Sequence, residues 1–219
     1  MTASYLRARG VARRFGTQVA LEPTDVDVHV GETLGLIGPN GAGKSTLLSL
    51  LAGALEPSAG TVERVDDVRV GWVPQRPAVY DRLTARENLE LFARLEGEHD
   101  HRGVAERLLA RFDVPPDRPA YTLSVGNRQR LNVALSLLGD PRVLLLDEPT
   151  ASLDPGQRRR LWETVAGLRE GGGSVVFATQ NLEELELYAD RVAVLQRGTL
   201  SFLGPTADYR RLHAEEIFA

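Results

Sequence analysis

The pattern of apolar and polar positions predicts alternating strands and helices at both ends of the chain. Residues 26–30 alternate as a half-buried strand does, and residues 33–37 form an apolar run bounded by glycines, which is typical of a central strand. Leucines within residues 47–51 favour a buried helix directly after a glycine-rich loop. Further strands are expected at 68–73, 143–146, 174–178 and 192–195, and further helices at 156–169 and 182–188. This order favours an α/β fold with a largely parallel sheet.

The middle of the chain shows no strand pattern. Thr84 and the glutamate three residues later have the spacing of a helix capping box. Apolar residues then recur at helical spacing, at Leu89, Phe92 and Leu95, at Val104, Leu108 and Phe112, and at Leu131, Leu135 and Leu138. We therefore predict one domain over residues 1–219, in which a helical subdomain at 81–139 is inserted into an α/β core made of residues 1–80 and 140–219.

Composition narrows the function classes. A net charge of -4 argues against a protein that grips bare nucleic acid, so no nucleic-acid partner is expected. The absence of cysteine excludes disulfides, thiolate metal sites and a cysteine nucleophile. Residues 1–14 lack the apolar core of a signal peptide, and no apolar stretch is long enough to span a bilayer. We expect a cytoplasmic location.

The glycine-rich segment after residue 37 fits the phosphate-loop pattern GxxxxGK[ST]. Its glycines let backbone N–H groups surround phosphate oxygens, Lys44 supplies positive charge, and Ser45 is a candidate magnesium ligand. An ordinary turn with an incidental Lys-Ser pair is the alternative, but the position between a strand and a helix favours nucleotide binding. The predicted nucleotide-binding residues here are Gly38, Pro39, Asn40, Gly41, Ala42, Gly43, Lys44, Ser45 and Thr46.

Two adjacent carboxylates follow the apolar run that begins at residue 143. In phosphate-loop enzymes the first such acid holds magnesium and the next polarises the attacking water, so Asp147 is a candidate metal ligand and Glu148 a candidate catalytic residue. Taken alone, a strand followed by Asp-Glu-Pro is equally compatible with an ordinary turn. The phosphate loop makes the functional interpretation the better one.

Five segments stand in the order found in ABC-type ATPases, and the chain resembles the ATP-binding subunit of an ABC transporter. They are residues 38–46, Gln75, residues 123–127, Asp147 with Glu148, and residues 152–154. The resemblance covers nearly the whole chain. It implies an α/β P-loop NTPase core of mostly parallel sheet, with an amino-terminal antiparallel β part and an inserted α-helical subdomain. It also implies ATP and Mg²⁺ as ligands.

The resemblance implies a head-to-tail dimer in which each ATP lies between the phosphate loop of one subunit and the signature segment of the other. The signature residues acting across that interface are Ser124, Val125, Gly126 and Asn127. Asp154 resembles the family's interface aspartate, and with Pro155 it also has the pattern of a helix N-cap. Ser124 as a helix cap and nothing more is the alternative for the signature.

Two further positions receive roles through the resemblance alone. Gln75 is assigned to magnesium and to the joint between the core and the helical subdomain. Phe15 is similar to the aromatic residue that stacks on adenine, while a core aromatic after an edge strand is the alternative.

Three departures from the family pattern predict slow hydrolysis. Val125 replaces the first glycine of the signature, Asn127 replaces its glutamine, and Gln180 stands where a histidine contacts the γ-phosphate. Glutamine can hydrogen-bond a phosphate oxygen, but it cannot carry the charge or exchange the proton of an imidazole. We therefore expect turnover to suffer more than ATP binding, and a better-matched second subunit in a heterodimer is an alternative to a homodimer.

Residues 80–89 resemble the corresponding part of subunits that serve separately encoded export permeases. The resemblance therefore implies an integral membrane permease as partner, a second ATP-binding subunit, and a peripheral position on the inner face of the cell membrane. A non-transport ABC-type ATPase, or a slow nucleotide-gated binding module, remains the alternative.

Overall fold

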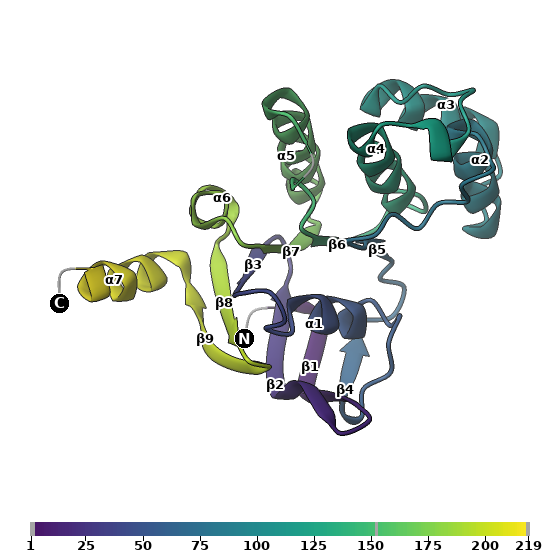
Figure 1. The fold of residues 1–219 in the computed structure, drawn as a ribbon. Helices are drawn as coiled ribbons and strands as arrows, with labels where there is room; N and C mark the ends of the chain where they lie inside the picture. Colours follow the sequence, from purple (N-terminus) through teal and green to yellow (C-terminus); the bar gives the residue numbers. More distant parts are fainter. Residues whose placement is uncertain (1–2, 152, 218–219) are drawn as a thin grey trace.

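The computed structural model describes residues 3–151 and 153–217, with side chains described up to residue 212. Its strands form two sheets (Figure 1). A three-stranded antiparallel sheet has the order β2-β1-β4, with β1 at Ser4–Phe15, β2 at Gln18–His29 and β4 at Ala59–Arg64. A six-stranded sheet has the order β5-β6-β7-β3-β8-β9. Its strands are β3 (Thr33–Ile37), β5 (Val70–Val73), β6 (Val143–Asp147), β7 (Ser174–Thr179), β8 (Arg191–Gln196) and β9 (Thr199–Pro205).

The six-stranded sheet is parallel except for β9, which pairs antiparallel with β8. Every residue of β3, β6 and β7 is buried, as expected for apolar runs that are covered on both faces. The predicted strands at 33–37, 143–146, 174–178 and 192–195 are confirmed within about one residue at each end. The α/β fold with a mostly parallel sheet is thereby confirmed.

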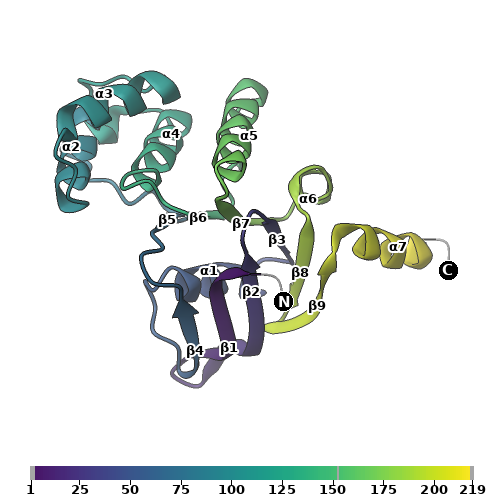
Figure 2. The same cartoon turned by 180° about the vertical axis from the view of Figure 1, so that it is seen from behind.

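The helices lie on both sides of this sheet (Figures 1 and 2). Helix α1 is packed between the two sheets, because its leucines share one apolar cluster with residues of β1, β6 and β7. Helices α4, α5 and α6 pack on the opposite face, where a second cluster includes Leu144, Leu146, Val175 and Phe177, and α2 and α3 pack against each other and against α4. The helices are α1 (Lys44–Leu51), α2 (Ala85–Leu95), α3 (His101–Phe112), α4 (Val125–Ser136), α5 (Pro155–Glu170), α6 (Leu182–Tyr188) and α7 (Thr206–Ile217), with a 3₁₀ turn at Ala120–Thr122.

The predicted capping box begins α2. The Thr84 hydroxyl accepts a hydrogen bond from the Glu87 backbone N–H at 3.1 Å, and the Glu87 carboxylate accepts one from the Thr84 N–H at 2.8 Å. Leu89 is fully buried, but Leu95 at the end of the helix is 69% exposed and does not continue the apolar face. The division into a core and a subdomain at residues 81–139 stays a prediction.

Several strands gave no usable pattern in the sequence. β1 contains four arginines and pairs with β2 through several register shifts, so strict alternation is lost. β2 begins at Gln18, eight residues before the predicted strand, because its first half is partly exposed and only weakly alternating. β9 is also largely exposed or half-buried. Within the described ranges, no helix is long and apolar enough to cross a membrane.

Candidate active site

The phosphate loop joins β3 to α1, as the sequence predicts. A Cβ at Gly38 would lie 2.1 Å from the Leu195 carbonyl oxygen, so only glycine fits there. Gly43 has φ 104°, and a Cβ there would lie 2.8 Å from the Ala20 carbonyl oxygen. Gly43 caps α1 without a side-chain hydrogen bond, so the first N–H groups of the helix face the loop and suit an anion.

Lys44 is folded back onto this loop. Its side chain is buried, and the Nζ donates hydrogen bonds to the carbonyl oxygens of Gly38 at 2.7 Å and Pro39 at 3.2 Å. Burial lowers the pKa of Lys44, while the nearby carboxylates of Glu148 and Asp147 act in the opposite direction. The ammonium group therefore lies among carbonyls and carboxylates at the mouth of the loop, where it can exchange a carbonyl partner for a phosphate oxygen.

Asp147 ends β6 beside the loop and is 3% exposed. Burial raises the pKa of its carboxyl group, and a hydrogen bond with Ser45 opposes that rise. Its Oδ1 atom is buried and has no hydrogen-bond partner in the part of the chain that the structure describes. A buried carboxylate oxygen of this kind, next to a serine hydroxyl, fits a Mg²⁺ ion that takes its other ligands from phosphate and water. The described residues hold no cluster of three or more His, Cys, Asp or Glu that could bind a metal without a nucleotide.

Glu148 lies between two glutamines. Its φ is 48°, in the left-handed region that is uncommon for residues other than glycine. Gln75 Nε2 donates to Glu148 Oε2 at 3.3 Å, and Gln180 Nε2 donates to Glu148 Oε1 at 2.7 Å and to Asn40 Oδ1 at 2.9 Å. The structure therefore brings together, in one cluster, predicted residues that follow β5, β6 and β7 and residues of the phosphate loop. Both carboxylate oxygens of Glu148 therefore accept a hydrogen bond from a glutamine amide.

A pocket of about 260 Å³ lies at this cluster. It is lined by Gln18, Val19, Ala20, residues 40–46, Gln75 and Glu148. Phe15 lies on the same β1–β2 hairpin, is 50% exposed, and carries the Arg13 guanidinium 4.6 Å from its ring centre. The alternative of a core aromatic after an edge strand is wrong, because the ring is half exposed and β1 is the middle strand. Reasoning from sequence missed Gln18, Val19 and Ala20, which carry no motif.

The signature segment begins α4, away from this pocket. Ser124 caps the helix and accepts a hydrogen bond from the Asn127 N–H at 3.2 Å, as predicted. Val125 is 67% exposed, and the Asn127 side chain accepts a hydrogen bond from Arg130. A Cβ at Gly126 would lie 2.9 Å from Gln157 Oε1 on α5. None of the four signature residues lines the phosphate-loop pocket, so one chain alone does not bring the two segments together.

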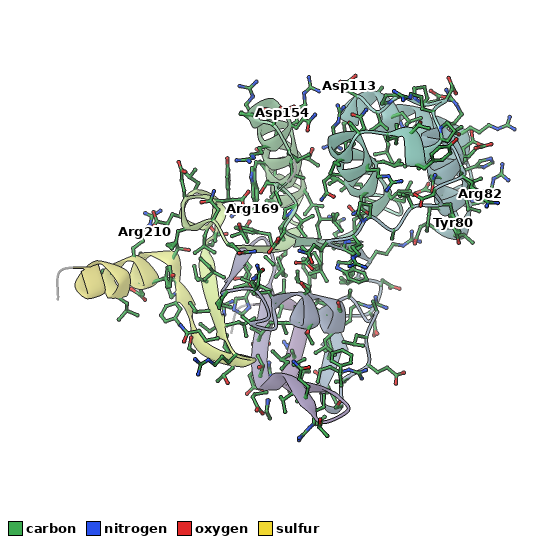
Figure 3. All side chains as sticks on the ribbon, in the orientation of Figure 1. Tyr80, Arg82, Asp113, Asp154, Arg169 and Arg210 are labelled. Carbon is green, nitrogen blue, oxygen red and sulfur yellow. The ribbon has the colours of Figure 1, made fainter. Side chains whose placement is uncertain are left out.

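Asp154 caps α5 through a hydrogen bond from the Gln157 N–H at 2.9 Å, with Pro155 at the first helical position, as predicted. Figure 3 places Asp154 at the end of α5 that points away from the sheets. Ser152, which the sequence places in the same segment, lies outside the described residues.

Comparisons with known proteins agree with this geometry. A model of the ABC transporter family matches residues 21–151. The daunorubicin resistance ATP-binding protein DrrA3 of Streptomyces coeruleorubidus is 40% identical over 222 residues, covering 95% of this chain and 70% of that protein. The Nod factor export ATP-binding protein I of Ralstonia nicotianae is 36% identical over 209 residues, covering 88% of this chain and 64% of that protein.

Two solved structures are also similar. The ATP-binding subunit of an ABC transporter superposes with a TM-score of 0.86 at 28% identity, covering 96% of this chain and 94% of that one. A dimeric ATP-binding cassette in a post-hydrolysis state, bound to ADP and Pi, has a TM-score of 0.83 at 24% identity, covering 92% and 98%. The second likeness shows the shared fold.

Proposed function

The chain belongs to the ABC transporter family, and from that membership we propose that it powers an exporter whose permease is a separate membrane protein. As a family member it is an ATP-binding subunit and an ATPase that dimerises and associates with permease components. Export is the proposed direction because similar relatives are named for drug resistance and for Nod factor export. We propose that the subunit lies on the cytoplasmic face of the membrane, held there by the permease.

The phosphate-loop cluster supports the proposed ATP site. Backbone N–H groups of residues 40–46 and the Lys44 ammonium bind the β- and γ-phosphates, and the half-exposed ring of Phe15 stacks on adenine. Ser45, Asp147 and Gln75 hold Mg²⁺, whose charge offsets that of the phosphates. The observation that carries this assignment is the buried Oδ1 of Asp147 beside the Ser45 hydroxyl, an oxygen that no described residue hydrogen-bonds.

Glu148 is the proposed base that polarises the attacking water, and its surroundings support slow turnover. Both of its oxygens accept amide hydrogen bonds, so the two glutamine amides compete with an attacking water for this carboxylate. Gln180 must also release Asn40 or Glu148 before it can donate to a γ-phosphate oxygen. It cannot then carry a positive charge as a histidine would.

The exposed start of α4 supports a site completed by a second subunit. Ser124, Gly126 and the neighbouring N–H groups form the proposed contact to ATP held by the partner, and Asp154 contacts the partner's phosphate loop. Val125 and Asn127 depart from the family pattern at this contact, which favours weak closure in a homodimer. A heterodimer with a better-matched subunit is the alternative, and mass measurement of the native complex distinguishes the two.

An exposed loop before α2 is the proposed permease contact. Buried Asn88 fixes this loop, because its side chain accepts a hydrogen bond from the Tyr80 N–H at 2.8 Å and donates to the carbonyl oxygens of Tyr80, Leu83 and Thr84. The loop presents Tyr80 and Arg82 on the outer side of the helical segments (Figure 3). A rigid backbone with an exposed aromatic ring and a cation suits a protein partner.

The experiment is extraction of the native complex in mild detergent, followed by identification of its partners and assay of Mg·ATP hydrolysis. An integral membrane protein that co-purifies and stimulates hydrolysis supports the transporter. A stable complex with soluble proteins alone identifies a non-transport ATPase. ATP binding without permease-stimulated hydrolysis identifies a nucleotide-gated binding module, the second candidate that the Gln180–Glu148 hydrogen bond favours. The matched control is the same complex with Lys44→Ala.

A further inference from the structure

Glu184 is a buried carboxylate that the proposed mechanism does not use. It lies on α6, is 7% exposed, and forms no ion pair with any Arg, Lys or His among the described residues. Its carboxylate accepts hydrogen bonds from Thr179 Oγ1 at 2.7 Å and from Trp162 Nε1 at 3.3 Å. Burying a carboxylate beside neutral donors alone costs folding free energy, so the presence of Glu184 at this position needs an explanation.

The Trp162 donor is held firmly in place. Its indole stacks on Tyr188 with ring centres 3.9 Å apart and an interplanar angle of 9°, and it meets Phe177 edge-on at 4.9 Å. These three aromatic residues come from α5, α6 and β7. The hydrogen bond from Trp162 therefore connects Glu184 to aromatic side chains of the core.

The Thr179 donor leads directly to the proposed active site. Thr179 Oγ1 donates to Glu184 and also accepts a hydrogen bond from the Asn181 N–H at 3.1 Å. Thr179 and Asn181 are the two chain neighbours of Gln180, whose own side chain is exposed and, among the described residues, is bonded to Asn40 and Glu148 alone. On one side of Gln180, Thr179 is thus bonded to the Glu184 carboxylate, and on the other side Asn181 is linked to that carboxylate through the Thr179 hydroxyl.

We propose that Glu184 is a positioning residue, which holds Thr179 and Asn181 so that the Gln180 side chain stays beside Glu148, where it can exchange one of its two partners for a γ-phosphate oxygen. The proposal rests on the proposed role of Gln180 in turnover. Glu184→Gln keeps the shape of the side chain but replaces one carboxylate oxygen with an NH₂ donor, so Thr179 and Trp162 no longer each donate to an acceptor oxygen of their own. Thr179→Val removes the bond nearest to Gln180, and Thr179→Ser keeps a hydroxyl at the same place.

The first test is a double-mutant cycle in the assembled complex, with ATP turnover and thermal unfolding measured on the same samples. Glu184→Gln is expected to lower kcat by about tenfold with KM for ATP little changed, and to have no further effect on kcat in a Gln180→Ala background. Any change that Glu184→Gln causes in the thermal unfolding temperature is expected both with Gln180 present and in the Gln180→Ala background. Thr179→Val is expected to reproduce the loss of kcat, and Thr179→Ser to restore it. The matched control is Glu183→Gln, at the exposed acid next in the chain, with unchanged kcat.

An equal loss of kcat in both backgrounds, or no loss at all, overturns the proposal, because a purely structural Glu184 acts independently of Gln180. The second test does not depend on turnover and follows the side-chain amide resonance of Gln180, assigned by its absence in Gln180→Ala. Broadening or a shift of that resonance in Glu184→Gln but not in Glu183→Gln supports positioning. If it shifts while Gln180→Ala leaves turnover unchanged, positioning stands and the proposed role of Gln180 falls. An unmoved resonance overturns positioning even when ATP binding and hydrolysis proceed as proposed.

Discussion

The phosphate-loop cluster and the signature segment differ in how completely they are formed within one chain. The cluster, made of residues 38–46 with Gln75, Asp147, Glu148 and Gln180, joins the ends of several strands and is held by hydrogen bonds across them. The signature segment, residues 124–127, is a helix start that lies at the surface. The cluster forms a pocket within one chain. The signature segment is proposed to act together with a second subunit.

The departures from the family pattern are distributed unevenly between these two regions. Every predicted residue of the phosphate loop matches the motif, whereas two of the four signature residues and the residue at 180 depart from it. Holding Mg·ATP and turning it over are therefore expected to separate in this chain. The predictions that follow address that separation, from the largest expected effect to the smallest.

Glu148→Gln is expected to lower ATP turnover by roughly 10² to 10⁴, because the carboxylate that accepts a proton is lost while the shape of the side chain is kept. Affinity for Mg·ATP is expected to stay close to that of the unaltered chain. Single-turnover hydrolysis and equilibrium nucleotide binding measure the two quantities, with the exposed Glu163→Gln as control. Hydrolysis within threefold of the unaltered chain would show that Glu148 is not the base.

Lys44→Ala is expected to weaken ATP binding by roughly 10- to 100-fold, the equivalent of losing a charge-assisted hydrogen bond of about 1.5 to 3 kcal/mol. Titration with a fluorescent ATP analogue measures the affinity. Because the Gly38 and Pro39 carbonyls also lose their donor, thermal unfolding must show that the loop region remains folded. Arg159→Ala serves as the control for lost positive charge, and an unchanged affinity in Lys44→Ala contradicts the assignment.

Gln180→His is expected to raise turnover by about tenfold, since an imidazole can carry charge and exchange a proton at the γ-phosphate. Gln180→Ala separates this gain from the simple release of Glu148, because it removes the amide without adding an imidazole. Steady-state hydrolysis of the assembled complex is the measurement. A Gln180→His complex that hydrolyses ATP at the original rate removes the main reason for expecting slow turnover.

The Thr84 cap of α2, which belongs to neither region, serves as a control for the Ser124 cap of the signature segment. Thr84→Ala and Ser124→Ala each remove a side chain that caps a helix, so each is expected to lower the free energy of unfolding by about 1 kcal/mol. Only Ser124→Ala is expected to weaken ATP-dependent dimerisation as well. Urea unfolding and size-exclusion chromatography with Mg·ATP measure the two effects. Equal dimerisation of both variants would show that Ser124 caps its helix and has no role in dimerisation.

The sequence predicts best where one physical constraint dominates. Strands β3, β6 and β7 are covered on both faces, so each is a short apolar run with clear ends. The strands β1, β4 and β9 are partly exposed and carry bulges or polar residues, so their positions could not be predicted from alternation. The antiparallel part was expected only through the family resemblance.

The candidate site shows the same division. The motif spacing predicts that Lys44, Ser45, Asp147 and Glu148 meet, because a phosphate loop and a strand end have defined places in a parallel sheet. The hydrogen bonds of Glu148 to the two glutamines could not be predicted, since they join side chains 73 and 32 positions away along the chain. The roles assigned to the individual residues stay predictions until variants are measured.

The most direct test of the separation between binding and turnover is a chain that carries Val125→Gly and Gln180→His together. Affinity for Mg·ATP and kcat are measured on the same purified complex, beside the unaltered chain. Turnover that rises at least tenfold while the Kd for Mg·ATP changes by less than about threefold is the predicted result. A kcat that stays unchanged, or a Kd that shifts as much as kcat, contradicts it.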